Sequence, residues 1–287
     1  MECVVWSVER GLFIELVMKN EVFRMKIKGL KNFRDLGGIR AGKKHIRKGL
    51  MFRSEVPVKV PETEMAKLKT EFGIDTIVDL RTSQEIEDNH YNVPEGVEYL
   101  HIPIFKESVI GITKEAGSNY RQFIINTRDK EVLRNSIPDI DILYAGILKE
   151  DSVVEMTGKA FRQIISNVLE GKATLFHCSW GKDRVGVLAS FLLSLLGVGM
   201  HDILKDYVFT NRAVKRKAWR DTLLILFFKR DMVVAKKVWR GSIAAPKYLT
   251  GLYEGIENDY GSIEVFFREA LGISDELRDS FRSAMLI

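Results

Sequence analysis

The chain has 287 residues, of which 46% are hydrophobic and 29% charged, a composition typical of a folded globular protein and unlike that of a disordered one. Its two cysteines, Cys3 and Cys178, exclude a disulfide framework and favour a reducing compartment. Residues 212–240 hold ten Lys or Arg and two Asp, which gives this segment a charge of +8. Because the whole chain has a net charge of +5, the other residues together carry −3. A negative remainder argues against a nucleic-acid-binding protein.

No secretory signal is expected at the N-terminus, because Glu2, Glu9 and Arg10 interrupt its apolar residues. The apolar run from Val185 to Leu196 is too short to span a bilayer. These features predict a cytoplasmic protein, and export by a route without a classical signal peptide is the alternative.

The first thirty residues predict β-structure. Two β-prone runs within residues 4–18 indicate a hairpin, and Phe23, Met25 and Ile27 alternate with basic residues as in a half-buried strand. The polar stretch that ends in Gly37 and Gly38 predicts a turn that needs positive φ or close backbone approach.

Strands and helices alternate from residue 51 onwards, which predicts the α/β class: a mostly parallel central sheet flanked by helices. Ligands of such sheets bind at the carboxyl ends of the strands. The expected elements are strands at 51–54, 74–80 and 99–105, a helix at 61–72, and a short helix containing Glu85 that Ser83 can cap.

Residues 106–151 are polar, with weak helical periodicity around 120–125 and 140–149, and fall between two core strands, so they predict an inserted helical lid. Residues 154–169 form the expected crossover helix. Residues 201–211 and the basic segment follow the apolar run at 185–196, and further helices are expected at 248–260, at 263–271 and from Ser274. No internal repeat or linker is visible, so one domain over residues 1–287 is expected.

The loop at residues 177–184 has the strongest chemical pattern in the chain. Thr174 to Phe176 indicate a buried strand, Val185 to Leu196 indicate a buried helix, and five residues separate Cys178 from Arg184 between them. A loop that enters a helix N-terminus binds anions and lowers the pKa of a cysteine. A thiolate, an N–H cradle and a bidentate guanidinium predict phosphoryl transfer through a cysteinyl-phosphate.

Simpler interpretations exist for single residues. A lone cysteine is usually a small buried hydrophobe, and His177 alone would be a core histidine, but the full string His-Cys-x5-Arg with Gly181 inside it favours an active site. The basic segment 212–240 also contains Trp219 and Trp239, which fits either an anionic membrane surface or a helix pair with a solvated basic face.

Several motifs along the chain occur together and in a fixed order. They are Asn32-Phe-Arg-Asp-Leu-Gly-Gly38, Arg53-Ser54, Asp79-Leu-Arg81, His177-Cys-x-x-Gly-Lys-Asp-Arg184, Pro246-x-Tyr248-Leu249 and Tyr260-Gly-Ser262. In these motifs the chain resembles the atypical bacterial tyrosine phosphatases of the mycobacterial protein tyrosine phosphatase B type. That resemblance implies the cysteine-phosphatase α/β fold with an extra helical lid, no metal or other cofactor, and substrates that are phosphotyrosine, phosphoserine or phosphothreonine, or phosphoinositides.

The resemblance implies a role for each residue of the loop. Cys178 would be the nucleophile, Arg184 would bind phosphate, and Asp183 would be the general acid. A weaker candidate for the acid is Asp79, for which a structural pairing with an arginine is preferred. The substrate-binding residues would be those whose N–H groups form the cradle, with a lysine charge at its rim: Ser179, Trp180, Gly181 and Lys182.

Two residues depart from the family pattern. Trp180 replaces a small residue, and Val185 replaces a Thr or Ser whose hydroxyl would stabilise the leaving thiolate. The alternative function is therefore a phosphate-binding module with little turnover. A sulfurtransferase is disfavoured by the Cys-x5-Arg spacing and by Asp183, and the expected partners are a phosphorylated protein or a phosphoinositide.

Overall fold

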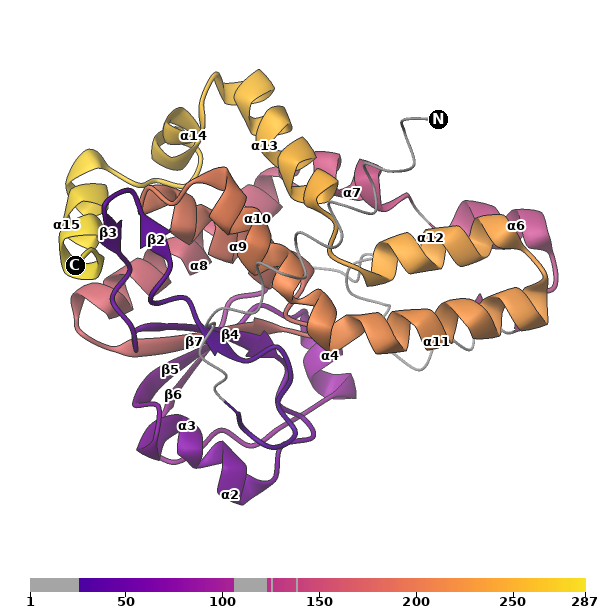
Figure 1. Cartoon of the computed structure of the whole chain (residues 1–287), viewed down its shortest axis with the longest axis horizontal. Helices are drawn as coiled ribbons and strands as arrows, with labels where there is room; N and C mark the ends of the chain where they lie inside the picture. Colours follow the sequence, from indigo (N-terminus) through magenta and orange to yellow (C-terminus); the bar gives the residue numbers. More distant parts are fainter. Residues whose placement is uncertain (1–25, 106–122, 125, 138) are drawn as a thin grey trace.

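The structure is a computed structural model that describes residues 26–105, 123–124, 126–137 and 139–287 (Figure 1). The predicted hairpin at 4–18 lies outside these residues, as do Phe23 and Met25 of the predicted strand. Residues 26–30 are described and form coil and a turn, so the expectation of a strand is wrong there.

The central sheet has five strands in the order β1-β4-β7-β5-β6. β4, β7, β5 and β6 run parallel and β1 pairs antiparallel with β4, which confirms the mostly parallel sheet expected from the sequence. The strands are β1 (Arg34–Asp35), β4 (Met51–Glu55), β5 (Ile74–Asp79), β6 (Glu98–His101) and β7 (Ala173–Cys178). A small second sheet pairs β2 (Arg40–Ala41) with β3 (Lys44–His45), which the sequence analysis did not foresee.

Side chains that alternate along the strands build a core on each face of the sheet. On β7, Leu175 packs towards α2 (Glu62–Met65) and α3 (Lys67–Thr70), whereas Phe176 packs towards the opposite core. That core includes α8 (Asp151–Leu169) and α9 (Asp183–Leu195), and Figure 1 shows α2 and α3 on one side of the sheet and α8 and α9 on the other.

The turn between β1 and β4 is closed by a carboxylate. Asp35 accepts hydrogen bonds from the N–H groups of Gly37 (2.7 Å) and Gly49 (2.6 Å). A Cβ on Gly37 would lie 2.3 Å from the Cα of Lys48, and Gly38 has φ +83°. Both glycine requirements expected from the sequence are confirmed.

The helices expected at 248–260, at 263–271 and from Ser274 are confirmed. The C-terminal helices are α10 (Met200–Phe209), α11 (Asn211–Lys229), α12 (Met232–Ser242), α13 (Pro246–Tyr260), α14 (Ile263–Glu269) and α15 (Asp275–Met285). The hydroxyl of Ser274 accepts the N–H of Leu277 (3.2 Å) and caps α15 as expected. No helix formed by the described residues has the length and apolarity needed to span a bilayer.

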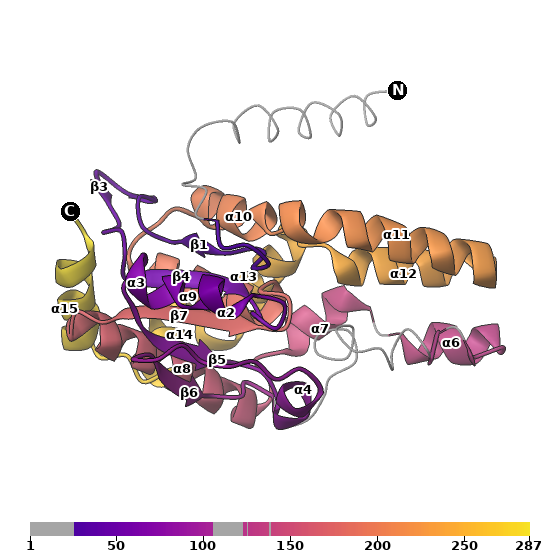
Figure 2. The ribbon, with the colours of Figure 1, turned by 90° about the horizontal axis from the view of Figure 1, so that it is seen from below.

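α11 and α12 form an antiparallel hairpin that projects from the body of the molecule (Figures 1 and 2). At its turn Arg230 is left-handed (φ 46°), and Asp231 caps α12 by accepting the N–H groups of Val233 (2.9 Å) and Val234 (3.1 Å).

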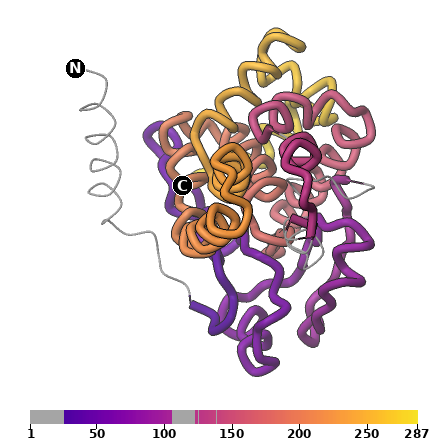
Figure 3. The backbone as a smooth tube through the Cα atoms, turned by 90° about the vertical axis from the view of Figure 1, so that its right-hand side faces the viewer, coloured from indigo at the N-terminus to yellow at the C-terminus, as the bar shows by residue number. Residues whose placement is uncertain are grey.

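The described part of the expected lid contains two short helices, α6 (Lys130–Ser136) and α7 (Ile140–Gly146), while residues 106–122 lie outside the description. Leu133 of α6 packs with Ile225 of α11 and Val234 of α12 in a separate apolar cluster. Figure 3, viewed towards the end of the hairpin, shows the chain of this insertion beside it.

Candidate active site

The predicted strand–loop–helix is present. β7 ends at Cys178, residues 179–182 form the loop, and α9 begins at Asp183. The side chains of Cys178, Asp183 and Arg184 are buried, with exposed fractions of 2%, 4% and 1%. The N–H groups in the first turn of α9 have no partner within the helix, so this end of the helix can bind an anion beside the thiol.

Gly181 brings the loop against β4. Its φ is +62°, and a Cβ on it would lie 2.3 Å from the carbonyl oxygen of Ser54, so a side chain does not fit. The Gly181 carbonyl accepts hydrogen bonds from Nδ2 of Asn32 (2.7 Å) and Nη2 of Arg53 (2.8 Å). The loop is therefore held from outside by residues of two earlier motifs.

A buried carboxylate anchors both arginines of this support. Asp206 of α10 accepts from Nε of Arg34 (2.6 Å) and from Nη1 of Arg53 (2.6 Å). Burial raises the pKa of Asp206, but the two guanidinium groups outweigh it and hold that pKa below its usual value. Burial lowers the pKa of Arg53 to about 10, which leaves the guanidinium charged at neutral pH.

Glu85 fixes the guanidinium of Arg184. Nη1 and Nη2 of Arg184 each lie 2.7 Å from a carboxylate oxygen of Glu85, and Nη1 also donates to the carbonyl of Leu80 (3.1 Å). The hydroxyl of Ser179 donates to the same carboxylate. Among the described residues nothing accepts from the buried Nε of Arg184, so that donor remains for a ligand.

A capping box places Glu85. α4 (Ser83–Asp88) is capped by Thr82, whose hydroxyl accepts the N–H of Glu85 (3.2 Å), while the Glu85 carboxylate accepts the N–H of Thr82 (2.9 Å). The expectation that Ser83 caps this helix is wrong by one residue, because Thr82 is the residue whose spacing to Glu85 allows both bonds. Burial raises the pKa of Glu85, but Arg184 and the hydrogen bonds hold it below its usual value.

Asp183 is oriented by a tyrosine from the inserted segment. The hydroxyl of Tyr144, on α7, donates to Oδ1 of Asp183 at 2.6 Å and lies 2.8 Å from the hydroxyl of Tyr207 on α10. Burial raises the pKa of Tyr144 well above its usual value, so this hydroxyl keeps its proton. Tyr144 thus fixes the orientation of the Asp183 carboxyl group through Oδ1.

Lys182 does not extend to an open rim. Its ammonium is buried, donates to the carbonyl of Gly241 at the end of α12, and lies 3.5 Å from Oδ2 of Asp183. The ring of Trp180 lies beneath the ammonium of Lys217 on α11, 4.4 Å from the ring centroid. The loop therefore contacts the base of the α11–α12 hairpin through these two residues.

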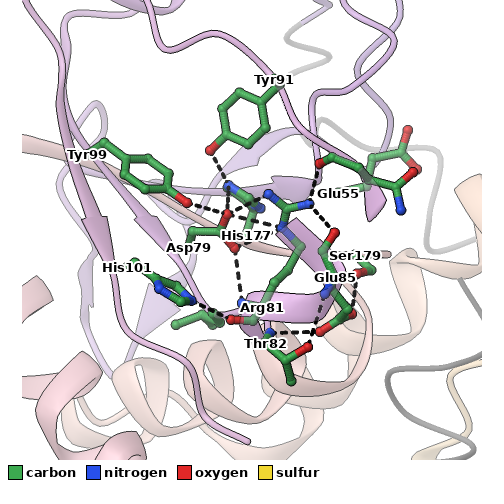
Figure 4. Close-up of polar contacts among 12 residues, drawn as sticks. Glu55, Asp79, Arg81, Thr82, Glu85, Tyr91, Tyr99, His101, His177 and Ser179 are labelled. Atoms are coloured by element: carbon green, nitrogen blue, oxygen red, sulfur yellow. Dashed lines mark hydrogen bonds and ion pairs between the residues drawn. The ribbon is translucent and has the colours of Figure 1, made fainter. Parts of the chain in front are cut away.

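Asp79 is tied to an arginine, as preferred from the sequence. Its Oδ2 accepts from Nη2 of Arg81 (2.7 Å) and from the hydroxyl of Tyr99 (2.9 Å), as Figure 4 shows. Burial raises the pKa of Asp79, but His177 and Arg81 outweigh burial and hold that pKa well below its usual value, so the carboxylate is ionised at neutral pH. That state cannot donate a proton at neutral pH.

His177 is a buried member of the same network. Its Nε2 lies 2.6 Å from the hydroxyl of Tyr91, and burial lowers the pKa of the imidazole to about 4 (Figure 4). The ring is therefore neutral near pH 7 and supports β7 rather than taking part in proton transfer.

Sequence reasoning missed most of the residues that support the loop. The Thr-x-x-Glu spacing of a capping box was a usable signal for Glu85. No local pattern marked Asp206 or Tyr144, because each meets its partner through a contact between distant segments.

Val185 is completely buried in the core cluster that also contains Cys178. The described residues hold no cluster of three or more His, Cys, Asp or Glu side chains that could ligate a metal ion.

Comparison with known proteins adds independent information. The model of the tyrosine phosphatase family matches residues 25–287. A protein of Cupriavidus necator whose name places it among the tyrosine-protein phosphatases is 27% identical over 246 residues, or 85% of this chain and 82% of that one. The triple specificity protein phosphatase PtpB of Mycobacterium tuberculosis is 23% identical over 278 residues, or 91% and 98%.

Among solved structures, that of P. aeruginosa TpbA is similar over 72% of this chain and 89% of its own, with 15% identity and a TM-score of 0.31. This score is too low to support an inference about fold or function.

Proposed function

Since the chain belongs to the tyrosine phosphatase family and is therefore a phosphatase, we propose that it hydrolyses phosphomonoesters, phosphotyrosine first among them, through a cysteinyl-phosphate on Cys178. One observation carries this proposal: Cys178 and Arg184 lie at the two ends of one loop, at a helix N-terminus, with the Nε donor of Arg184 without a partner among the described residues. A phosphate held by that donor and by the loop N–H groups would present its phosphorus to the thiolate.

In the first step the Sγ thiolate of Cys178 attacks phosphorus. An S–P bond forms as the bond between phosphorus and the ester oxygen breaks, and Asp183 gives its proton to that leaving oxygen. The 2.6 Å bond from Tyr144 to Oδ1 supports this role for Asp183, because it holds the carboxyl group in one orientation in the first turn of α9. Arg184 and the loop N–H groups stabilise the equatorial oxygens.

In the second step water attacks the phosphocysteine. Asp183, now a carboxylate, accepts a proton from that water, the S–P bond breaks, and inorganic phosphate and the thiolate are released. Glu85 keeps Arg184 in place through both steps, as two 2.7 Å bonds between buried groups support.

Access to the thiol requires movement, because Cys178 is 2% exposed. We propose that the chain works as one phosphatase domain in which residues 106–151 act as a lid. Tyr144 supports this, since it comes from the described part of that segment and contacts Asp183 directly.

The substrate is either a phosphorylated protein or a phosphoinositide, and phosphoserine and phosphothreonine belong to the proposal for the protein class. We place the enzyme in the cytoplasm. The +8 charge of residues 212–240 supports peripheral contact with an anionic membrane. The alternative of a phosphate-binding module with little turnover is favoured by Val185, which offers no hydroxyl to the leaving thiolate.

The test is hydrolysis of a soluble aryl phosphate by the purified full chain. Cys178→Ser should abolish turnover, whereas Cys3→Ser, the matched change at the other cysteine, should leave it intact. EDTA should have no effect. Turnover that survives Cys178→Ser, or that EDTA removes, would refute the mechanism. Phosphopeptides and phosphoinositides assayed side by side would then identify the substrate class.

A further inference from the structure

The far end of the α11–α12 hairpin exposes large apolar side chains in one place. Five of them, here called the apolar tip, are between 46% and 76% exposed: Leu223, Phe227, Phe228, Met232 and Val233. They lie in the last two turns of α11 and the first turn of α12, on both sides of the turn at Arg230. Single exposed apolar residues are ordinary, but a cluster with two adjacent phenylalanines marks an interaction surface.

The apolar tip is not needed to hold the hairpin together. Other side chains of the same helices fill that interface: Ile225 of α11 packs with Val234 and Val238 of α12 and with Leu133 of α6. Near the turn, α11 and α12 therefore each have one buried set of apolar side chains and a second set that is exposed. A shallow hollow of about 570 Å³ runs along the exposed side of α11 and has Leu223, Leu224 and Phe227 among its walls. The exposed side is therefore available to a partner.

Charge around the apolar tip selects the kind of partner. Arg220, Arg230 and Lys236 are exposed near it in the sequence. Asp221, the acid next to Arg220, pairs with Arg220 at 3.2 Å and with Lys217 at 2.8 Å. The acid closest to the turn, Asp231, is buried, caps α12 and pairs with Arg134 at 2.8 Å, so it presents no negative charge to a partner. An apolar centre with a cationic margin is complementary to the acyl and headgroup regions of an anionic bilayer.

We propose that the apolar tip inserts into an anionic lipid bilayer and holds the phosphatase site at the membrane surface. The role of this contact rests on the proposed phosphatase function. Within residues 212–240, the contact with the membrane is assigned to the turn end of the α11–α12 hairpin. Insertion removes aromatic surface from water, and the margin of arginines and lysines remains among the headgroups.

The hairpin links the bilayer to the active-site loop. Lys217, which lies over Trp180, precedes Phe227 by ten residues on α11, about 15 Å at 1.5 Å per residue. Gly241, whose carbonyl accepts from Lys182, lies in the last turn of the other helix. The docked tip would therefore keep the active-site loop about 15 Å, measured along α11, from the inserted end of the hairpin.

The experiment measures cosedimentation of the full chain with vesicles of phosphatidylcholine, with and without phosphatidylserine. The parent should bind the mixed vesicles and bind less as salt is raised. The double variant Phe227→Ser/Phe228→Ser should bind at least about tenfold more weakly. The matched control is Leu169→Ser/Ile287→Ser, which removes two exposed apolar residues outside the hairpin and should bind as the parent does.

Soluble aryl-phosphate hydrolysis separates this inference from the proposed function. The parent, the Phe227→Ser/Phe228→Ser variant and the control variant are assayed without lipid, together with Cys178→Ser as a fourth protein that should bind vesicles but not turn over. Parental hydrolysis by Phe227→Ser/Phe228→Ser shows that it is folded. Vesicle binding without any turnover would overturn the proposed function and leave the inference standing.

Two results would overturn the inference. One is equal vesicle binding by the parent and the Phe227→Ser/Phe228→Ser variant. The other is a parent that ignores vesicles but forms a dimer that the same variant loses, because the occupant of the tip would then be a second copy of the chain.

Discussion

Glu85→Gln tests whether the fixed orientation of Arg184 is essential to catalysis. The substitution keeps the size of the side chain but removes the negative charge of the carboxylate that accepts two 2.7 Å hydrogen bonds from the Arg184 guanidinium. Removing one partner of a buried ion pair costs about 3–5 kcal/mol, because the other charge stays buried and unpaired. If about 3 kcal/mol of this loss appears in the transition state, kcat/KM falls by about a hundredfold.

The assay is steady-state hydrolysis of an aryl phosphate, with thermal unfolding measured on the same samples. Glu87→Gln is the matched control, since Glu87 lies on the same helix and is exposed. We expect kcat to fall in Glu85→Gln while Glu87→Gln stays at the parental value. A folded Glu85→Gln enzyme with parental kcat/KM would refute the reasoning, because Arg184 would then need no fixed partner.

Three further predictions follow from the site. Asp183→Asn should slow alkyl phosphates more than activated aryl phosphates, because a good leaving group needs less protonation; equal losses would place the acid elsewhere. His177 takes up a proton near pH 6.5 in the unfolded chain but only near pH 4 in the folded protein. About 3 kcal/mol of the free energy of unfolding should therefore be lost as pH falls from 6.5 to 4, and urea unfolding of His177→Gln should depend less on pH in this range. Val185→Thr should raise steady-state turnover by about tenfold to a hundredfold and remove a pre-steady-state burst; a variant no faster than the parent would mean that another group stabilises the leaving thiolate.

The sequence was sufficient for the elements whose signals are local. The buried run before Cys178, the apolar helix after it and the five-residue spacing to Arg184 lie within one short stretch, and the structure forms that strand, loop and helix. The last helix, expected from Ser274, is capped by that residue, whose hydroxyl accepts the N–H of Leu277. Local hydrogen bonding and periodicity therefore determine these elements before tertiary contacts form.

The residues that the sequence did not reveal act across large sequence distances. Tyr144 meets Asp183 over 39 positions, Glu85 meets Arg184 over 99, and Asp206 meets Arg53 over 153. No periodicity links such pairs, because they meet only when helices α4, α7 and α10 pack around the sheet and α9. The expectation that Lys182 stands at an open rim fails for the same reason, because its acceptor Gly241 belongs to a helix 59 residues away.

The motif at Asn32 to Gly38, which carries most of the specificity of the family resemblance, lies outside the N–H cradle and acts on the opposite side of the loop. Nδ2 of Asn32 donates to the carbonyls of Trp180 (3.4 Å) and Gly181 (2.7 Å), and Arg53 donates to the Gly181 carbonyl as well. The peptide bond is planar and trans, so a carbonyl held on one side of the loop directs the N–H of the same peptide to the other side. In the mechanism proposed above, Asn32 and Arg53 would therefore orient the loop N–H groups towards the phosphate before it binds. Donors that are already oriented need no rearrangement during the reaction, so this motif can contribute to catalysis without contact to the substrate.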